Sequence, residues 1–419
     1  MQRHNSISAG TMPWLMLAAG LGLFACGGGS GGHDLGGGMT DDTDTGSDGD
    51  SDADGDTDSD TDGDTDSDTD VDAGEDAGAK IPNVVFVTST AHASNALGGL
   101  AGADAICAER AATAGLEGTY VAWLSTSEGD AKDRLAGSRG WVRTDGLPFA
   151  DEVSDLTAGV IWYPPRLDEL GNEVDPLTFV STGTSPDGTA HADLLCNDWT
   201  YADAGVAGDA GVTGDAEIGS AYGGTDIWTN WGNAACDIPR ALYCFGIGND
   251  TPVAPQPQSG RIAFVSAAAF MPGGGLAAAD ARCQAEAAAA SLAGTFRALL
   301  AAGSASAASR FSAAGAAWVR RDGVPVASSA AAFLGGELPV AAIALAADGK
   351  TYLGNTGVWS GAAAVDETPG ADMTCSDWTA ATAAEHGRGG RAGTTSPFFF
   401  DMDSNGCGDT WIHLLCLEE

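Results

Sequence analysis

The sequence predicts an α+β protein with mainly antiparallel strands, arranged as two tandem domains. The 419 residues contain one internal duplication, with an offset of 171 to 179 residues between matching segments. That offset is much longer than the period of a solenoid repeat and indicates duplicated domains. Within each repeat, one alanine-rich helical segment is followed by short strand signals and long loops. A repeat of about 160 residues is long enough to bury one hydrophobic core.

The duplication sets the domain boundaries. We expect the first folded domain at residues 81–247, a linker at 248–260 and the second domain at 261–419. Three prolines punctuate the linker, as is typical of a connecting segment. The matching segments are 86–89 with 264–267, 98–107 with 274–283, 118–124 with 294–300, 141–146 with 318–323 and 196–200 with 375–379.

The secondary structure expected for the first repeat begins with a strand and one helix. Alanine-rich sequence around Cys107 favours a helix, and Gly115 and Gly118 mark its end. Short runs of β-branched and aromatic residues predict strands. The expected elements are, in order, a strand at 83–88, a helix at about 101–114, strands at 119–124 and around 141–143, and short strands near 177–181 and 241–245.

Residues 1–25 are interpreted as a lipoprotein signal peptide. An apolar run from Met12 to Ala25 is too short and too glycine-rich for a membrane span. It ends in Leu23-Phe24-Ala25-Cys26, which resembles the lipobox of bacterial lipoproteins, where cleavage leaves the cysteine lipid-modified. The alternative is an ordinary secretory signal with an incidental cysteine. Gly27 after the cysteine implies outer-membrane sorting, so we expect an exported protein anchored at the cell surface through Cys26.

Residues 26–80 are expected to form a disordered tether. Between Asp41 and Asp76 there are 18 acidic residues and no basic ones. With almost no apolar side chains to bury, such a segment cannot offset the entropy lost on ordering. The stretches 50–55 and 58–63 match the first half of an EF-hand loop, but the twelfth position lacks the glutamate that calcium sites use. Weak calcium binding by the tether is the most that this pattern predicts.

The charge balance limits the class of partner. The chain has 58 acidic and 18 basic residues, for a formal net charge of −40. Without the Asp-rich stretch the remainder still carries −22. Because like charges repel, nucleic acids and anionic lipid surfaces are not expected as partners.

The nine cysteines are spaced as expected for disulfides and not for metal sites. They do not show the C-x-x-C or Cys/His spacings of zinc sites. If Cys26 carries lipid, eight remain, four in each repeat, and disulfides can form outside the cytoplasm. Four cysteines allow three pairings, and spacing alone does not choose among them.

Several segments resemble the endostatin domains of collagens XV and XVIII. They are 118–125 and 294–300, Gly102-Ala103-Asp104 with Cys107, the turn 182–188 leading to Cys196, and Leu242-Tyr243-Cys244. The chain is also similar to the bacterial DUF1554 family, a set of endostatin-like and C-type-lectin-like domains of unknown function. The resemblance covers nearly all of Val84–Phe245 and, more loosely, Ile262–Leu417.

The resemblance implies a specific fold. Each repeat would be a C-type-lectin-like (endostatin-like) domain with mainly antiparallel strands, one or two helices, long loops and two nested disulfides. Carried over, the endostatin pattern pairs Cys107 with Cys244, Cys196 with Cys236, Cys283 with Cys416, and Cys375 with Cys407. Each outer bond would tie the first helix to the last strand, and each inner bond would hold a segment with little regular structure. A disulfide typically contributes about 2–4 kcal/mol.

Departures from these families argue against their known ligands. Endostatin binds heparin through arginine clusters, which this acidic chain lacks, and its amino-terminal zinc ligands have no counterpart near Val84. Calcium-dependent lectins use a Pro-containing acidic loop and a Trp-Asn-Asp motif. Here Trp231-Gly232-Asn233 keeps only the spacing, and Ser185-Pro186-Asp187 is a partial echo of the loop. We expect neither a metal site nor a cofactor, and heparin-like polyanions are not expected as ligands.

Catalytic patterns are nearly absent, so an enzyme is not expected. The sequence has no H-E-x-x-H, G-x-S-x-G or Walker motif. His191 near Asp193 and Asp198 is open to two interpretations, a general base with an orienting acid or a solvated loop histidine. Asp198 and Asp377, in the repeated Asp-Trp-Thr, could face a ligand or could hold a turn beside a buried tryptophan.

The best binding candidates are aromatic and polar residues in the loops of the first repeat. They are Trp162, Tyr163, Asp187, Trp228, Trp231 and Asn233. Aromatic rings beside amides suit stacking on sugars or packing against protein, although the same rings could instead cap the core. The sequence thus favours a cell-surface lipoprotein with two non-catalytic modules that bind an extracellular glycan or protein. The alternative is a structural component of the envelope or matrix that acts by self-association.

Overall fold

The computed structural model describes residues 81–94, 97–200 and 214–419. The predicted signal peptide, the lipid attachment at Cys26 and the Asp-rich tether with its calcium prediction lie outside these residues. All described residues belong to one compact unit, Val71–Glu419. Within the described part, no helix is both long enough and apolar enough to cross a membrane. We refer below to residues 81–247 as the first repeat and to 261–419 as the second repeat.

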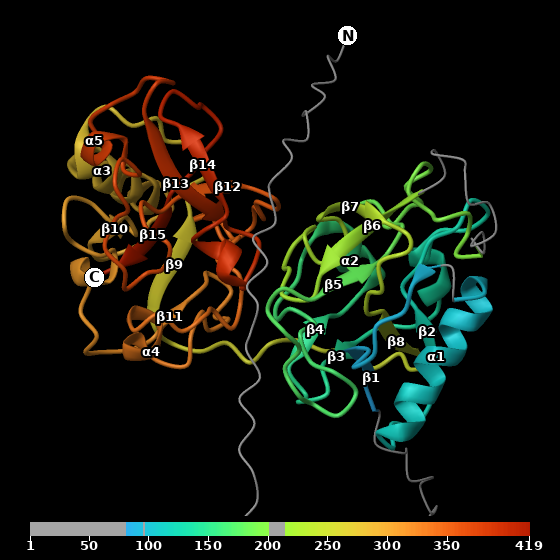
Figure 1. Ribbon diagram of the computed structural model, residues 1–419. Coiled ribbons are helices and arrows are strands. Elements are labelled where there is room, and N and C mark those ends of the chain that lie inside the picture. The colour runs from blue at the N-terminus through green and yellow to red at the C-terminus, as the bar shows by residue number, and fades with distance from the viewer. Residues whose placement is uncertain (1–80, 95–96, 201–213) are drawn as a thin grey trace, which may run out of the picture. The chain divides into compact units, whose positions relative to one another are not determined.

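The first repeat is built on a five-stranded sheet in the order β2-β8-β1-β3-β4 (Figure 1). Its members are β1 (Asn83–Val87), β2 (Thr119–Ala122), β3 (Trp141–Val142), β4 (Pro148–Ala150) and β8 (Tyr243–Ile247). The last strand pairs antiparallel with both β1 and β2, while β3 runs parallel to β1. The sheet therefore brings the beginning and the end of the repeat together.

The second repeat has a sheet of matching order, β10-β15-β9-β11. Its members are β9 (Arg261–Val265), β10 (Phe296–Ala298), β11 (Trp318–Val319) and β15 (Leu415–Glu418). Again the last strand pairs antiparallel with the first and second strands, and the third runs parallel to the first. The duplication seen in the sequence is therefore also a duplication of sheet topology.

Each repeat also has a small antiparallel sheet formed by its second half. The first comprises β5 (Phe179–Ser181), β6 (Asp215–Ser220) and β7 (Gly232–Ala235), and the second comprises β12 (Gly357–Trp359), β13 (His386–Arg391) and β14 (Asp403–Gly406). These sheets lie among long connecting loops. The predicted α+β class with mainly antiparallel strands and long loops is confirmed.

Among the described residues, each repeat has one long helix, α1 (Gly99–Thr113) or α3 (Gly275–Ala289). In α1 the buried residues Ala103, Cys107 and Ala111 follow one another at intervals of four, and α3 repeats this stripe. Such a narrow row of small side chains lets the helix lie close to its sheet. The shorter helices are α2 (Val153–Ala158), α4 (Ala330–Leu334) and α5 (Cys375–Trp378), with 3-10 turns η2 (Ala131–Leu135), η3 (Ala308–Arg310) and η4 (Pro397–Phe399).

Four disulfides brace the two repeats. The pairs are Cys107–Cys244, Cys196–Cys236, Cys283–Cys416 and Cys375–Cys407. These are the nested pairs that the resemblance to endostatin implies. Each outer bond joins the long helix to the last strand of the central sheet. Two bonds lie in each repeat, and none joins one repeat to the other.

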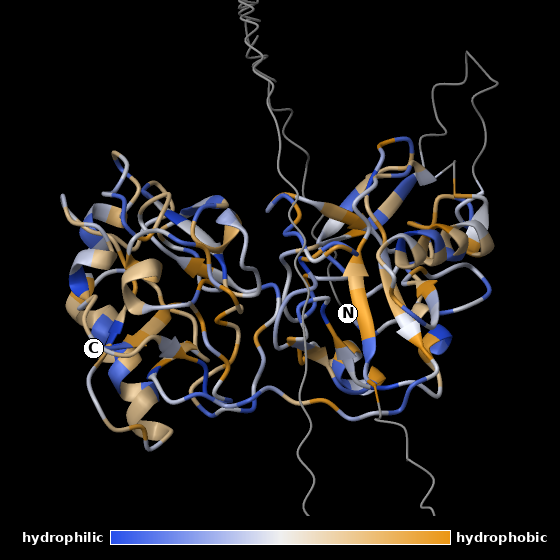
Figure 2. Cartoon of the chain, turned by 90° about the horizontal axis from the view of Figure 1, so that it is seen from below, coloured by the Kyte–Doolittle hydropathy of each residue, from blue (hydrophilic) through white to orange (hydrophobic). Residues whose placement is uncertain are grey.

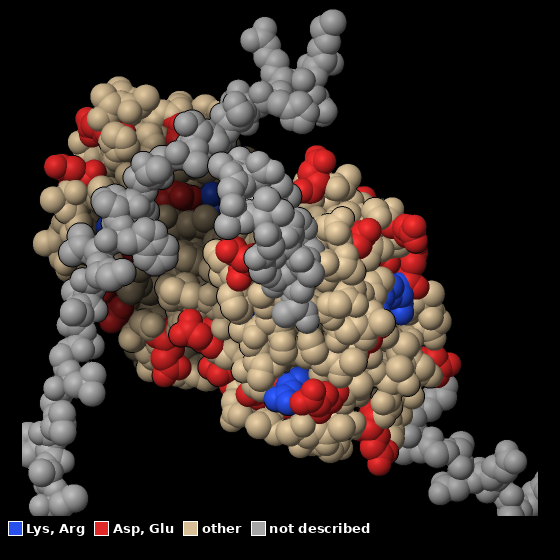
Figure 3. Space-filling view, turned by 45° about the vertical axis from the view of Figure 1, so that its right-hand side comes forward, with Lys and Arg blue, Asp and Glu red and all other residues tan. Residues whose placement is uncertain are grey.

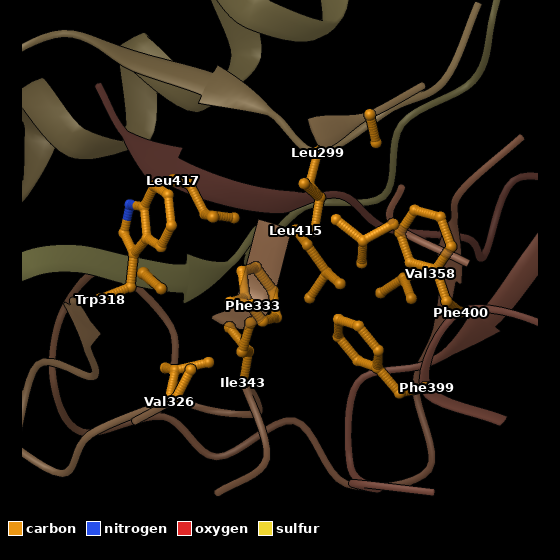
Figure 4. Packing of buried hydrophobic residues seen from close by; sticks show 14 of the residues in the cluster. Leu299, Trp318, Val326, Phe333, Ile343, Val358, Phe399, Phe400, Leu415 and Leu417 are labelled. Atoms are coloured by element: carbon orange, nitrogen blue, oxygen red, sulfur yellow. The ribbon is translucent and has the colours of Figure 1, made fainter. Parts of the chain in front are cut away.

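The central sheets are buried on both faces, which explains their nearly continuous apolar sequences. In β1, Val85 and Val87 belong to one hydrophobic cluster of the first repeat, and Phe86 belongs to the other. Figure 2 shows the hydrophobic colour along strands of this repeat. In the second repeat, Leu415 and Leu417 of β15 point into a cluster that also holds Trp318 and Phe399 (Figure 4).

Candidate binding surfaces

Trp228 lies in the core of the first repeat. Its side chain has no exposed surface, and its ring centroid is 4.9 Å from that of Trp123, 5.3 Å from Phe149 and 5.5 Å from Tyr243. Its indole nitrogen is buried and has no hydrogen-bond partner among the described residues. A ring in this position packs in the core and does not face solvent. Trp228 therefore follows the second interpretation given above for the loop aromatics, that they cap the core.

Tyr163 and Trp162 lie in a small hydrophobic cluster with residues of the second repeat. Tyr163 is 6% exposed and packs with Val324 and Ala341, and Trp162 is partly buried against the same cluster. Burial raises the pKa of the Tyr163 hydroxyl, and the guanidinium of Arg143 lies 5.8 Å from the Tyr163 ring. Both rings are therefore engaged by other parts of the chain.

Trp231 is likewise held between other rings. Its centroid lies 5.9 Å from that of Phe179 and 5.3 Å from that of Phe398, with which it stacks at an interplanar angle of 29°. Phe398 belongs to the second repeat, so this candidate residue also joins the two repeats.

Asp187 and Asn233 are exposed but engaged locally. The carboxylate of Asp187 accepts hydrogen bonds from the hydroxyl and the backbone N–H of Thr189, at 2.6 and 3.1 Å, and these bonds lower its pKa. The amide of Asn233 donates to the carboxylate of Asp215 at 2.7 Å. Among the described residues, no group of three or more His, Cys, Asp or Glu side chains is placed to hold a metal ion.

The repeated Asp-Trp-Thr motif forms an unusual turn. Four consecutive non-glycine residues, from Cys196 to Trp199, have φ between 46 and 64°, and 375–378 repeat this left-handed turn with φ between 51 and 66°. Such backbone costs roughly 1–2 kcal/mol per residue and persists only where its surroundings fix it. The carboxylate of Asp198 accepts from the N–H and the hydroxyl of Ser127, both at 2.6 Å, and Trp199 is buried. In this turn Asp198 has a structural role.

His191 does not form an acid–base pair with its acidic neighbours. Its Nδ1 is buried without a hydrogen-bond partner in the described part of the chain, and Asp198 is bound to Ser127 instead. The geometry of a base with an orienting acid is thus not assembled here.

Glu217 is a buried carboxyl that the sequence analysis did not single out. It lies on β6, is 3% exposed, and accepts a hydrogen bond from the backbone N–H of Gly232 at 3.1 Å. Burial raises the pKa of Glu217 from 4.5 to about 7, and the bonds from Gly232 and Ile218 lower it only partly. At the equivalent strand position the second repeat has Arg388, which pairs with Asp401.

Glu217 predicts a pH dependence of stability. Because its pKa is higher in the folded than in the unfolded chain, the folded state holds a proton that the unfolded state releases between about pH 4.5 and 7. Stability is therefore expected to fall as the pH rises through this window. Glu217→Gln removes the buried charge and is expected to stabilise the chain at pH 8 by up to about 3 kcal/mol, with little effect at pH 4. Urea unfolding at both pH values measures this, and an equal effect at both would contradict it.

The largest exposed aromatic surface in the described chain lies in the second repeat. Trp411 is 47% exposed, and the guanidinium of Arg391 lies 5.5 Å from its ring. A Cβ on Gly357 would come within 2.4 Å of the ring, so this glycine lets the indole lie against β12. Arg391 also pairs with Asp403 at 2.8 Å. Trp411 is not among the binding candidates predicted from the sequence, which all lie in the first repeat.

The chain matches no model of a known protein family, and a search of curated proteins finds no related sequence.

Proposed function

We propose that this is an exported protein, anchored at the outer surface through a lipid on Cys26, whose repeats bind an extracellular glycan. The signal sequence and its Leu-Phe-Ala-Cys ending support export and anchoring. Four disulfides are compatible with a protein that works outside the cytoplasm. The endostatin-like and C-type-lectin-like resemblance supports a binding module rather than an enzyme.

The observation that carries the proposal is the presentation of Trp411. Its ring is fixed between the Gly357 backbone and Arg391, so little conformational entropy is lost when a ligand stacks on its free surface. The C–H face of a sugar packs well on such a ring, and the Arg391–Asp403 pair beside it offers both hydrogen-bond donors and acceptors for hydroxyl groups.

The surface charge narrows the class of glycan. On the face drawn in Figure 3, acidic side chains outnumber basic ones, in keeping with the excess of 58 acidic over 18 basic residues. Polyanionic glycans would be repelled at moderate ionic strength. We therefore expect a neutral oligosaccharide, bound without calcium.

A binding experiment tests this function. The full chain carrying Cys26→Ser is applied to a printed array of neutral and acidic oligosaccharides, with and without a calcium chelator. We expect binding to neutral glycans that Trp411→Ala weakens at least tenfold, because stacking anchors of this kind dominate binding energy. Trp411→Phe is expected to restore part of the affinity.

The matched control is Leu170→Ala, which removes an apolar side chain of the first repeat that is 60% exposed. It is expected to leave binding unchanged. Equal binding by wild type and Trp411→Ala would overturn the assignment of the site. Concentration-dependent oligomers with no glycan binding would favour the structural envelope role instead.

A further inference from the structure

A segment of the second repeat pairs with a loop of the first through its backbone. Gly223 and Thr394 form an antiparallel bridge. The N–H of Gly224 donates to the carbonyl of Gly393 at 2.7 Å, and the N–H of Thr395 donates to the carbonyl of Tyr222 at 2.8 Å. Main-chain pairing of this kind is how many proteins bind an extended peptide. We call residues 393–398 the docking segment.

The docking segment is buried and closely fitted. Thr394, Thr395 and Ser396 have no exposed surface. A Cβ on Gly224 would lie 3.0 Å from the Cβ of Ala342 and 3.4 Å from the carbonyl oxygen of Gly393. An added side chain would be tighter than most Cβ contacts in proteins, so glycine allows the two repeats to approach closely here, with a fit like that of a protein interior.

Side chains extend the contact on both sides of the docking segment. At its end, Phe398 stacks on Trp231. Elsewhere, the guanidinium of Arg320 is 1% exposed and donates to the carbonyl of Ile161 in the first repeat at 3.0 Å. In the opposite direction, the guanidinium of Arg166 donates to the carbonyl of Pro339 at 3.1 Å. Buried cations need such partners, because an unsatisfied buried charge costs several kcal/mol.

The linker is also bound along its length. The N–H of Val253 donates to the carboxylate of Asp151 in the first repeat at 2.9 Å, and the N–H of Gln258 donates to the carbonyl of Gly323 in the second at 2.9 Å. A linker held at both ends does not let the repeats move freely.

We propose that the docking segment is a built-in ligand for the loops of the first repeat, so that residues 81–419 form one rigid, cooperative unit. The loop aromatics Trp162, Tyr163 and Trp231 then serve recognition within the chain. The faces of these rings that pack between the repeats are not open to an external ligand unless the repeats separate. This inference goes beyond the proposed function and does not depend on it, because the contact would hold whatever the protein binds.

A cleavage experiment on the full chain tests the proposal. A protease site inserted between Ala254 and Pro255 allows the linker to be cut, and no disulfide then joins the two halves. We expect the halves to elute together in gel filtration at micromolar concentration, at the volume of the uncut chain. Separate elution of two folded halves would overturn the proposal.

Two interface variants sharpen the test. Gly224→Val places a side chain against Ala342 across the contact, and Phe398→Ala removes the stack on Trp231. Each variant is expected to raise the dissociation constant of the two cut halves at least tenfold. The control is Gly129→Val, where an added Cβ meets nothing nearer than the Thr126 hydroxyl at 3.8 Å. Circular dichroism confirms that each variant is folded, and dissociation unchanged from wild type in both would contradict the proposal.

Discussion

Trp228→Ala is expected to lower the free energy of unfolding by about 3–5 kcal/mol, the range for removing a large buried aromatic side chain. The ring is fully buried among Trp123, Phe149 and Tyr243, so the substitution leaves a cavity that rigid neighbours cannot fill. Urea or guanidinium unfolding, followed by fluorescence and circular dichroism, measures the loss.

Trp228→Phe is the matched control for that substitution. Because the indole nitrogen of Trp228 has no hydrogen-bond partner within the part of the chain that the structure describes, phenylalanine gives up no polar contact there. It also leaves a smaller cavity than alanine. We expect it to cost less than half as much as alanine. If Trp228→Ala were as stable as wild type, the ring could not be part of the core, and its interpretation as a ligand contact would return.

Removing the outer disulfide of the first repeat is expected to have the largest effect. Chain-entropy arguments give about 5 kcal/mol for Cys107–Cys244 and about 4 kcal/mol for Cys196–Cys236, because they close loops of very different length. The sequence separations are 137 and 40 residues. We therefore expect the double substitution to serine at Cys107 and Cys244 to destabilise more than the same change at the inner pair.

The comparison is made by unfolding both double variants under the same non-reducing conditions. The two bonds also differ in what they hold together. The Cys107 bond joins α1 to β8 across the buried core, whereas the Cys196 bond holds the left-handed turn. A larger loss from the inner pair would contradict the entropic ranking and would show that the left-handed turn controls the stability of the repeat.

Much of the fold was predictable because its signals are local or repeated. The alanine row around Cys107 predicts the helix, and a run of β-branched and aromatic residues predicts the first strand. The disulfide pairing came from resemblance alone, since spacing left three possibilities open. The parallel pairing of β3 with β1 had no local signal, because it depends on how the chain returns after the helix.

The candidate surface was harder to predict, because exposure is decided by tertiary packing. An aromatic residue in a loop has the same local sequence whether it faces solvent or another repeat. Trp231 is covered by Phe398, 167 positions further along the chain, and no pattern near Trp231 indicates this. Trp411 lies with its ring against β12 at Gly357, a contact between two segments that are distant in the sequence. The local sequence around Glu217 does not indicate its burial either, since that burial depends on contact with Gly232 of β7.

Oxidative footprinting of the tryptophans in the full chain tests the central claim, that the loop aromatics pack within the chain and Trp411 is presented outward. Brief hydroxyl-radical exposure followed by peptide mass spectrometry gives a modification rate for each ring, without requiring a known ligand. We predict that Trp411 is modified fastest, that Trp162 and Trp231 react more slowly, and that Trp228 is protected. Modification of Trp162 and Trp231 as fast as that of Trp411 would contradict the account.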